Sequence, residues 1–504
     1  MPGKVKDGRI KYDKFDYKVG SKSELIGFAL GIILLAVSLV PLIPDFPADL
    51  MCMISAVLCS YPVVIDAFYG LKKKKLRKPL LLVIIIIGLM IIGRFFDAAV
   101  CAVLIRAGDM AEKAVSRREK KLLAGRSKAI AETGHLVRED GGLEITDASD
   151  IAVGNAFAVL PGEVMPVDAL IEEGKGAFDM SLITGDTTPV FAGPGDTVPA
   201  GAVNGQSTVY CIAYRDKDSS AACRIYKAVS DACGKEFPGE KHKKTAKYLS
   251  ALFIISGILI AVIGSIVTGS PFDYICRGLG VCALCFAGSA LSGSRLIAVS
   301  SLIDTAGAGA VLTSPEGMGK LIKSKVILLC EEVFAKRSPE IKSAVALFKN
   351  YGVRETDAVI PEGETAKAVF AKQCGIDRVF SGDELSIKTD QKLIIDSSEM
   401  TVSERYAADG DFTAVYNYLG FDKEADAVFT GPNLLRAAGV IRKCLRYRGV
   451  MRIFTLFFAA LKIAAAVLAG LGIIPVWVSF ASDIAILAFA FIACLGAGKT
   501  ANGK

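Results

Sequence analysis

Five residues that could do chemistry lie inside long apolar stretches of the sequence. Asp97, Lys462 and Asp483 carry charges, and Cys282 and Cys285 carry thiols three positions apart. A charge inside a bilayer costs about 2.5–3.5 kcal/mol or more, so each charged group needs a partner or a function. An ion pair between Lys462 and Asp483 would satisfy both residues, with or without transport. On a regular helix the two cysteines would share a face and could bind a soft cation, although such cysteines are also ordinary small apolar residues.

The apolar stretches that hold these residues are long enough to cross a bilayer. The chain has 504 residues and is 52% hydrophobic, more than a soluble protein of this length needs. The apolar runs cover residues 24–43, 49–70, 79–93, 95–108, 247–268, 274–298, 453–473 and 475–496. The first run follows a polar stretch and shows no small-residue cleavage site, so we interpret it as an anchor. The sequence therefore predicts a polytopic α-helical membrane protein with about eight transmembrane helices.

The distribution of charge predicts the orientation of these helices. Lys/Arg clusters occupy 72–78, 113–127, 241–247 and 442–452, whereas the short loops at 44–48, 269–273 and 473–475 carry none. By the positive-inside rule, both termini and the polar blocks 109–246 and 299–452 are expected to be cytoplasmic, with the helices in the cell membrane. This topology accounts for the net charge of +7, so no nucleic-acid partner is expected. The thirteen cysteines are expected to be reduced thiols.

The first polar block has the pattern of a compact β-rich domain. Residues 125–215 carry short apolar or alternating runs separated by Gly, Pro and Asp. Three motifs follow one another there: Pro-Gly-Glu-Val-Met-Pro-Val-Asp at 161–168, Ser-Leu-Ile-Thr-Gly-Asp-Thr-Thr-Pro-Val at 181–190, and Ala-Gly-Ala-Val-Asn-Gly at 200–205. In this order and spacing they resemble the actuator domain of P-type ATPases. A soluble β domain with another role is the alternative.

The resemblance gives the loop at Thr184, Gly185 and Asp186 a catalytic role. In that family a Thr-Gly-Glu loop swings onto a phosphorylated Asp, and its Glu positions the water that hydrolyses the acyl phosphate. Here Asp186 stands in place of that Glu, and its side chain is one methylene shorter. A misplacement of a catalytic group by about 1 Å can cost about 100-fold in rate. A carboxylate in a tight Gly turn is also an ordinary turn residue. We therefore expect the loop to be vestigial.

The second polar block lacks the family's phosphate-handling motifs. The apolar strand at 326–329 lies where the family places the strand before its phosphorylated Asp, which puts Cys330 in the Asp position. The sequence contains no Asp-Lys-Thr-Gly-Thr, no Gly-Asp-Gly-x-x-Asn-Asp and no P-loop. Cysteine can act as a covalent nucleophile, but Glu331 and Glu332 follow directly and would disfavour a polyphosphate. We expect a buried structural cysteine in a reduced α/β remnant of the phosphorylation domain, and neither ATP nor Mg²⁺ as cofactors.

The plan of two, four and two spans resembles the heavy-metal branch of this family, and three positions resemble its zinc/cadmium type. Asp97 stands in place of a metal-pathway Glu, and Lys462 and Asp483 match a membrane Lys and Asp. The family's Cys-Pro-Cys would fall near Phe286, where neither thiol nor proline is present, and Cys282 and Cys285 are the nearest thiols. The resemblance implies Zn²⁺ or another divalent heavy-metal cation as a ligand.

These observations predict a pseudo-pump without ATP hydrolysis, which binds metal or an unidentified protein partner in the lipid bilayer. The alternative is an active heavy-metal transporter with a divergent catalytic centre or a nucleotide domain supplied by a partner. The predicted segments are cytoplasmic termini at 1–23 and 497–504, membrane pairs at 24–70, 71–108, 247–298 and 453–496, an actuator-like domain at 109–246, and the remnant at 299–452.

Overall fold

The computed structural model describes all of the chain except residues 1–21, 73–77, 126, 128–129, 206, 236–239, 286–287, 336, 381–390, 398, 409–410, 420–424 and 499–504. The chain divides into two compact units. One consists of Met1–Ser116, Glu240–Gly293 and Phe454–Phe491, and the other of Arg117–Gly239, Ser294–Ile453 and Ile492–Lys504. Most of the two predicted terminal segments, 1–23 and 497–504, lies outside the described residues.

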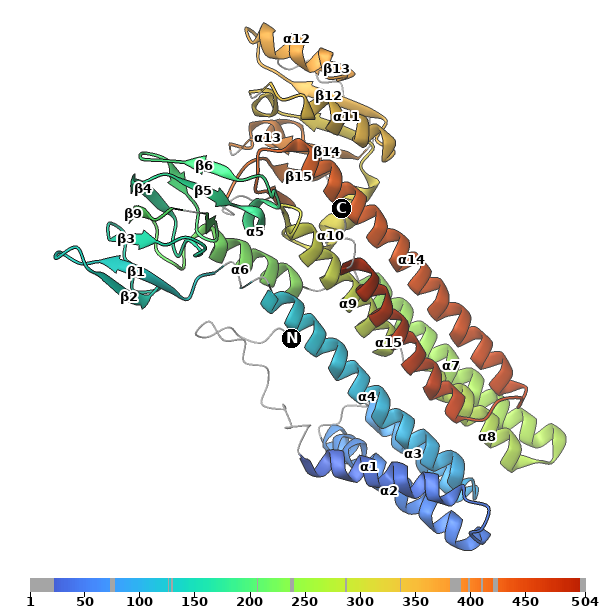
Figure 1. Ribbon diagram of the computed structural model, residues 1–504. Helices are drawn as coiled ribbons and strands as arrows, with labels where there is room; N and C mark the ends of the chain where they lie inside the picture. Colours follow the sequence, from blue (N-terminus) through green and yellow to red (C-terminus); the bar gives the residue numbers. More distant parts are fainter. Residues whose placement is uncertain are drawn as a thin grey trace. The chain divides into compact units, whose positions relative to one another are not determined.

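Long apolar helices make up the first unit (Figure 1). Within the described residues, five stretches are long and apolar enough to cross a membrane: α2 (Asp45–Lys72), most of α7 (Glu240–Thr268), the stretch Pro271–Ala306, α14 (Leu434–Gly470) and α15 (Trp477–Gly498). The apolar parts of α1 (Lys22–Ser38) and α3 (Lys78–Ile91) are shorter, and α4 (Phe95–Ala124) continues into a charged segment. The chain is thus a multi-pass membrane protein with about five clear spans, fewer than the eight that the sequence predicts.

The predicted span at 274–298 is not one regular helix. It consists of α8 (Pro271–Cys282), the 3₁₀ turn η2 (Ala283–Cys285) and α9 (Gly288–Ala306), with residues 286–287 outside the described residues. The sequence analysis treats this stretch as one apolar span and notes that the family's proline is missing. Glycines supply a physical reason for the break, since Gly278, Gly280 and Gly288 each weaken a helix. At Gly278 a Cβ would lie 2.5 Å from the carbonyl oxygen of Gly257, so α7 packs directly on the α8 backbone.

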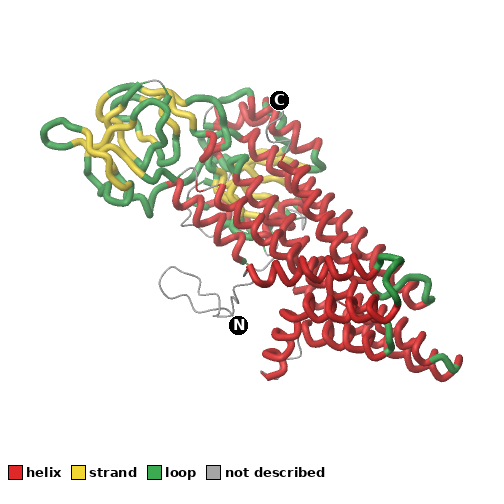
Figure 2. The backbone as a smooth tube through the Cα atoms, turned by 60° about the horizontal axis from the view of Figure 1, so that its bottom comes forward, coloured by secondary structure: helices red, strands yellow, loops and turns green. Residues whose placement is uncertain are grey.

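The second unit contains the strands, which gather in two groups (Figure 2). In the β-rich group, an antiparallel sheet has the order β2-β1-β3-β9-β4-β7, and a smaller one the order β6-β5-β8. The strands are β1 (Thr133–Val137), β2 (Leu143–Asp147), β3 (Ala156–Val159), β4 (Ala169–Glu173), β5 (Gly176–Asp179), β6 (Val190–Ala192), β7 (Thr197–Val198), β8 (Val203–Asn204) and β9 (Val209–Ala213). The predicted β-rich domain is present.

One buried carboxylate fastens this domain to the helix that follows it. Asp168 is 1% exposed, and its Oδ1 accepts hydrogen bonds from the backbone N–H groups of Ala200 (2.8 Å) and Ala221 (3.0 Å). Ala221 begins α6 (Ala221–Gly234), so the carboxylate also lies at the positive end of a helix. Arg215 approaches its other oxygen at 3.3 Å. These contacts give Asp168 a structural role.

The second group of strands forms a mixed sheet of order β10-β16-β15-β14-β11-β12-β13, parallel except at β10. The strands are β10 (Ala310–Leu312), β11 (Val326–Leu329), β12 (Glu355–Val359), β13 (Arg378–Phe380), β14 (Lys392–Asp396), β15 (Phe412–Val415) and β16 (Ala427–Phe429). The helical segments of this domain are α10 (Pro315–Lys323), η3 (Glu331–Phe334), α11 (Glu340–Asn350), α12 (Thr365–Gln373) and α13 (Thr401–Tyr406). The predicted α/β domain is present with seven strands in one sheet, and its relation to a phosphorylation domain stays a prediction.

Candidate functional site

Two helices bring together the charged pair that the sequence predicts in the membrane. Lys462 of α14 donates to Asp483 Oδ1 of α15 at 2.8 Å, and the lysine side chain is only 1% exposed. Ser289, on the first turn of α9, donates its hydroxyl to the same oxygen at 2.6 Å. An unpaired charge would be costly here, so the ion pair and the hydroxyl together explain how the membrane unit tolerates both charges.

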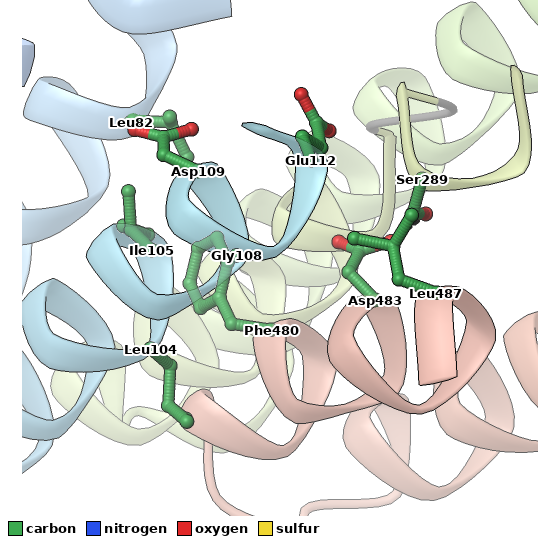
Figure 3. Close-up of a pocket in the computed structure, with 10 residues that line it drawn as sticks. All are labelled: Leu82, Leu104, Ile105, Gly108, Asp109, Glu112, Ser289, Phe480, Asp483 and Leu487. Carbon is green, nitrogen blue, oxygen red and sulfur yellow. Dashed lines mark hydrogen bonds between the residues drawn. The ribbon is translucent and has the colours of Figure 1, made fainter. Parts of the chain in front are cut away.

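Asp483 and Ser289 line a small cavity that also contains Asp109 and Glu112 of α4 (Figure 3). The cavity volume is about 30 Å³, and the remaining wall is apolar. A polar cavity of this size can hold a water molecule or an ion that has shed its hydration shell. Three carboxylates therefore line one small cavity among the membrane helices, but they do not converge closely enough to bind one metal ion together.

Sequence reasoning missed Asp109 and Glu112 because they follow directly after the predicted span at 95–108. The signal was present, since the two acids lie three positions apart on a helix that continues without a break from that span. Their place in the same cavity as Asp483 could not be read from the sequence, because it depends on how α4 packs against α9 and α15.

The other predicted metal-binding residues lie elsewhere in the membrane unit. Asp97, 8% exposed, lies in the first turn of α4, pairs at 3.5 Å with Arg94 just before that helix, and does not line the cavity. Cys282 ends α8 and Cys285 belongs to η2, so the regular helix on which the predicted pair depends is interrupted between them. Within the described part of the chain, no three His, Cys, Asp or Glu side chains are gathered closely enough to hold a metal ion. The structure therefore brings Lys462 and Asp483 together, but not Asp97 or the two cysteines with them.

A second candidate site lies at the carboxyl edge of the mixed sheet, where ligands bind in open α/β sheets. Cys330 follows β11 at this edge and is 2% exposed. Burial, together with the negative charge of Asp396, raises the pKa of the Cys330 thiol to about 12. The group is therefore a protonated thiol at neutral pH, which is a poor nucleophile.

Asp396, at the end of the neighbouring strand β14, is fully buried and fully engaged by its own loop. One carboxylate oxygen accepts from the N–H of Ser397 at 2.7 Å, and the other from the N–H of Ser403 at 2.5 Å. These bonds stabilise the turn that leads into α13. They also satisfy two backbone N–H groups that would otherwise be buried without a hydrogen-bond acceptor. The structure thus gives Asp396 a structural role beside Cys330.

The loop of Thr184, Gly185 and Asp186 also lies in this second unit. It follows the short helix α5 (Ser181–Thr184), and Gly185 adopts the left-handed conformation with φ 72°. Asp186 accepts from the Thr188 N–H at 3.1 Å and from the Arg436 guanidinium at 3.1 Å. Burial would raise the pKa of Asp186, but hydrogen bonds from Thr188 and the charge of Arg436 lower it below its usual value. The carboxylate is ionised and held by two partners.

A cavity of about 470 Å³ separates this loop from the sheet edge. Asp186, Glu332 and Glu340 line it, and its described lining residues include no Lys or Arg. Burial and the neighbouring carboxylates Glu331, Glu399 and Asp396 raise the pKa of Glu332. A lining of this charge disfavours a polyphosphate.

Comparison with known proteins gives this arrangement a family context. Residues 128–230 match the family model described as the P-type ATPase actuator domain. A probable cobalt/nickel-exporting P-type ATPase of Mycobacterium tuberculosis is 29% identical over 163 residues, which are 32% of this chain and 25% of that protein. A cadmium-transporting ATPase of Staphylococcus aureus is 27% identical over 229 residues, which are 45% of this chain and 31% of that protein.

Over part of its length, the chain is similar to heavy-metal-transporting P-type ATPases. The alignments span about a quarter to a third of the length of these relatives. A solved zinc-transporting PIB-type ATPase in the E2.Pi state is similar over 95% of this chain and 100% of that one, with a TM-score of 0.45 and 16% identity. The actuator domain predicted from the motifs is confirmed by the family match. The assignment of Cys330 and Asp186 to the catalytic positions of the P-type ATPases stays a prediction.

Proposed function

We propose that this chain is a pseudo-pump: a heavy-metal P-type ATPase relative that has lost ATP hydrolysis and binds a divalent cation or a membrane partner. The observation that carries the proposal is the state of Cys330. A buried thiol whose pKa is raised to about 12 stands where the family phosphorylates an Asp, and it is neither ionised nor accessible. Phosphoryl transfer depends on positioned charge, and a neutral buried thiol supplies none.

The surrounding acids support the same conclusion. Both oxygens of Asp396 accept backbone hydrogen bonds, and Asp186 is paired with Arg436. The connection from β11 to β12 runs from residue 330 to residue 354, and its described residues form η3 and α11, which is short for the nucleotide domain that the resemblance implies there. Transfer from ATP would need cations around the phosphates, and the cavity beside Cys330 offers carboxylates instead.

The membrane cavity supports a cation as the ligand. Asp109, Glu112 and Asp483 line this cavity, and Asp483 is paired with Lys462. Carboxylate oxygens are ligands for divalent cations, including Zn²⁺. We propose that the protein lies in the cell membrane with its termini and both strand-containing domains in the cytoplasm. The Lys/Arg clusters lie next to these segments, and the positive-inside rule assigns such clusters to the cytoplasmic side.

The alternative is an active heavy-metal transporter with a divergent catalytic centre, or one that uses a partner's nucleotide domain. Asp186 favours it, because its lowered pKa keeps an ionised carboxylate on the loop that the family uses for hydrolysis. That alternative predicts an ATPase rate that depends on metal and is lost in Asp186→Asn.

The decisive experiment incubates the purified chain with radiolabelled ATP, Mg²⁺ and Zn²⁺ and measures acid-stable, hydroxylamine-labile label. We expect none, and none in Cys330→Asp, because a restored carboxylate alone does not restore a nucleotide site. A label on the natural chain would refute the pseudo-pump. Metal binding is measured separately, by Zn²⁺ content after equilibrium dialysis. Asp109→Asn/Glu112→Gln should lower it, and Glu139→Gln, an exposed change in the β-rich domain, serves as the matched control.

A further inference from the structure

Helix α14 carries an unusual concentration of positive charge where it meets the membrane. Over Leu434–Gly470 the helix contains seven Lys or Arg residues and no Asp or Glu. The basic residues concentrate at 442–452, directly before the apolar segment that begins at Ile453. Arg442, Arg446, Arg448 and Arg452 are exposed, and Arg448 and Arg452 lie one helical turn apart. Like charges at this spacing repel each other, so an anion beside them would stabilise the helix.

The same helix face continues as an exposed apolar stripe. Leu456 is 70% exposed and Ile463 is 59% exposed. With 3.6 residues per turn, Arg448, Arg452, Leu456 and Ile463 fall within an arc of about 80°. Because α14 is one continuous helix (Figure 1), the face that carries Arg448 and Arg452 continues into the face that carries Leu456 and Ile463.

The distances along the helix match the layers of a bilayer. At about 1.5 Å per residue, Arg448 lies about 7.5 Å and Arg452 about 1.5 Å before Ile453. The headgroup layer on each side of the hydrocarbon core is about 5–8 Å thick, so both guanidinium groups lie at headgroup depth. Ile463 lies about 15 Å beyond Ile453, which is the depth of one leaflet of hydrocarbon.

We infer that this face of α14 is a binding site for an anionic phospholipid. The headgroup phosphate contacts Arg448 and Arg452, and an acyl chain lies along Leu456 and Ile463. Guanidinium groups suit the site because they bind phosphate oxygens in bidentate fashion. The aliphatic stripe distinguishes a lipid from a soluble phosphate, which would gain nothing from it. This inference does not depend on whether the protein hydrolyses ATP.

The test titrates the full-length protein in detergent with phosphatidylglycerol and, separately, with phosphatidylcholine of the same acyl chains, and counts bound lipid by native mass spectrometry. We expect a preference for phosphatidylglycerol. An arginine at an anionic surface contributes about fivefold to binding, so Arg448→Gln/Arg452→Gln should lower phosphatidylglycerol affinity by about 25-fold and leave phosphatidylcholine unchanged. Arg448→Lys/Arg452→Lys should retain most of the preference.

Arg442→Gln is the matched control, because Arg442 is exposed on the same helix but lies about 16 Å before Ile453, beyond the headgroup layer. It should change the affinity less than twofold. An equal loss in this control would show diffuse charge attraction and overturn the site, as would competition by glycerol phosphate at the same concentration as the lipid. A change of oligomeric state in the double variant, with bound lipid unchanged, would assign the face to protein contact instead.

A second measurement keeps the inference testable if the double variant does not fold. A photoactivatable phosphatidylglycerol is cross-linked to the natural chain, and the labelled peptide is identified. We expect label within residues 448–463. Label distributed over all helices in proportion to their exposed area would contradict the inference.

Discussion

A methyl group at Gly309 should release the loop of Thr184, Gly185 and Asp186. Gly309 lies between α9 and β10 with φ +84°, and a Cβ there would overlap the carbonyl oxygen of Thr184. The two backbone segments also approach each other closely at Gly185, since a Cβ there would lie 2.6 Å from the Ala308 carbonyl carbon. In the Gly309→Ala variant the loop cannot keep its position, because the overlap involves main chain on both sides.

The magnitude follows from the contacts that the loop would lose. Thr430 donates its hydroxyl to the Ile183 carbonyl at 2.7 Å, a buried hydrogen bond that contributes about 1–1.5 kcal/mol. The Arg436–Asp186 pair is partly exposed and contributes well under 1 kcal/mol after screening by solvent. The free energy of opening the loop should therefore fall by about 2 kcal/mol, which is about a 30-fold rise in exchange. The left-handed backbone adds about 1–2 kcal/mol, which acts on global stability.

Hydrogen exchange of the peptide 181–188, followed by mass spectrometry, measures this opening. Gly352→Ala is the matched control, because Gly352 also has a positive φ, +94°, yet nothing lies within 4 Å of its added Cβ. The control carries the backbone cost without the overlap, so it should leave exchange in 181–188 unchanged. The reasoning is refuted if Gly309→Ala leaves this peptide protected, or if Gly352→Ala opens it equally.

Three further predictions concern buried polar groups. Lys462→Met should destabilise the membrane unit by about 3–5 kcal/mol, because Asp483 is left unpaired, and adding Asp483→Leu should recover most of the loss in thermal unfolding in detergent. Asp396→Ala should lower the free energy of unfolding of the mixed-sheet domain by about 2–4 kcal/mol in denaturant titrations, because two buried N–H groups lose their acceptor. Cys330, whose pKa is raised to about 12, should resist iodoacetamide at pH 8 until the protein is denatured. Since the thiol ionises near pH 9 when unfolded, its contribution to stability is lost as pH rises from about 9 toward 12, and rapid labelling of the folded chain at pH 8 would contradict this.

The sequence predicted those parts of the fold that depend on local pattern. Each apolar run overlaps a helix, and the Gly-, Pro- and Asp-separated runs at 125–215 form the predicted β-rich domain. The Lys462–Asp483 pair was predictable because two opposite charges in apolar helices have few other partners. These inferences needed only composition, spacing and the cost of an unpaired charge in a bilayer.

The remaining features depend on contacts between distant segments, which pattern does not report. Asp109 and Glu112 were missed because their role depends on the packing of α4 against α9 and α15. The helix break before Gly288 was missed because only proline was considered as its cause. The α/β class of the second polar block was predicted, but its individual strands, such as β13 (Arg378–Phe380), are too short to stand out in a single sequence.

The partners of the acidic residues bear directly on the choice between a pump and a pseudo-pump. A carboxylate that works in a transport cycle must exchange its partner for a cation or a water at each turnover. Asp483 would have to leave Lys462, and separating a buried pair costs several kcal/mol unless another charge replaces it. In a pump, phosphorylation supplies that free energy. Without a phosphorylated group at Cys330, a cation entering beside Asp483 must itself overcome the repulsion of Lys462. In the proposed pseudo-pump, the Lys462–Asp483 pair should therefore stay intact, and Asp483 should not exchange its partner for a cation.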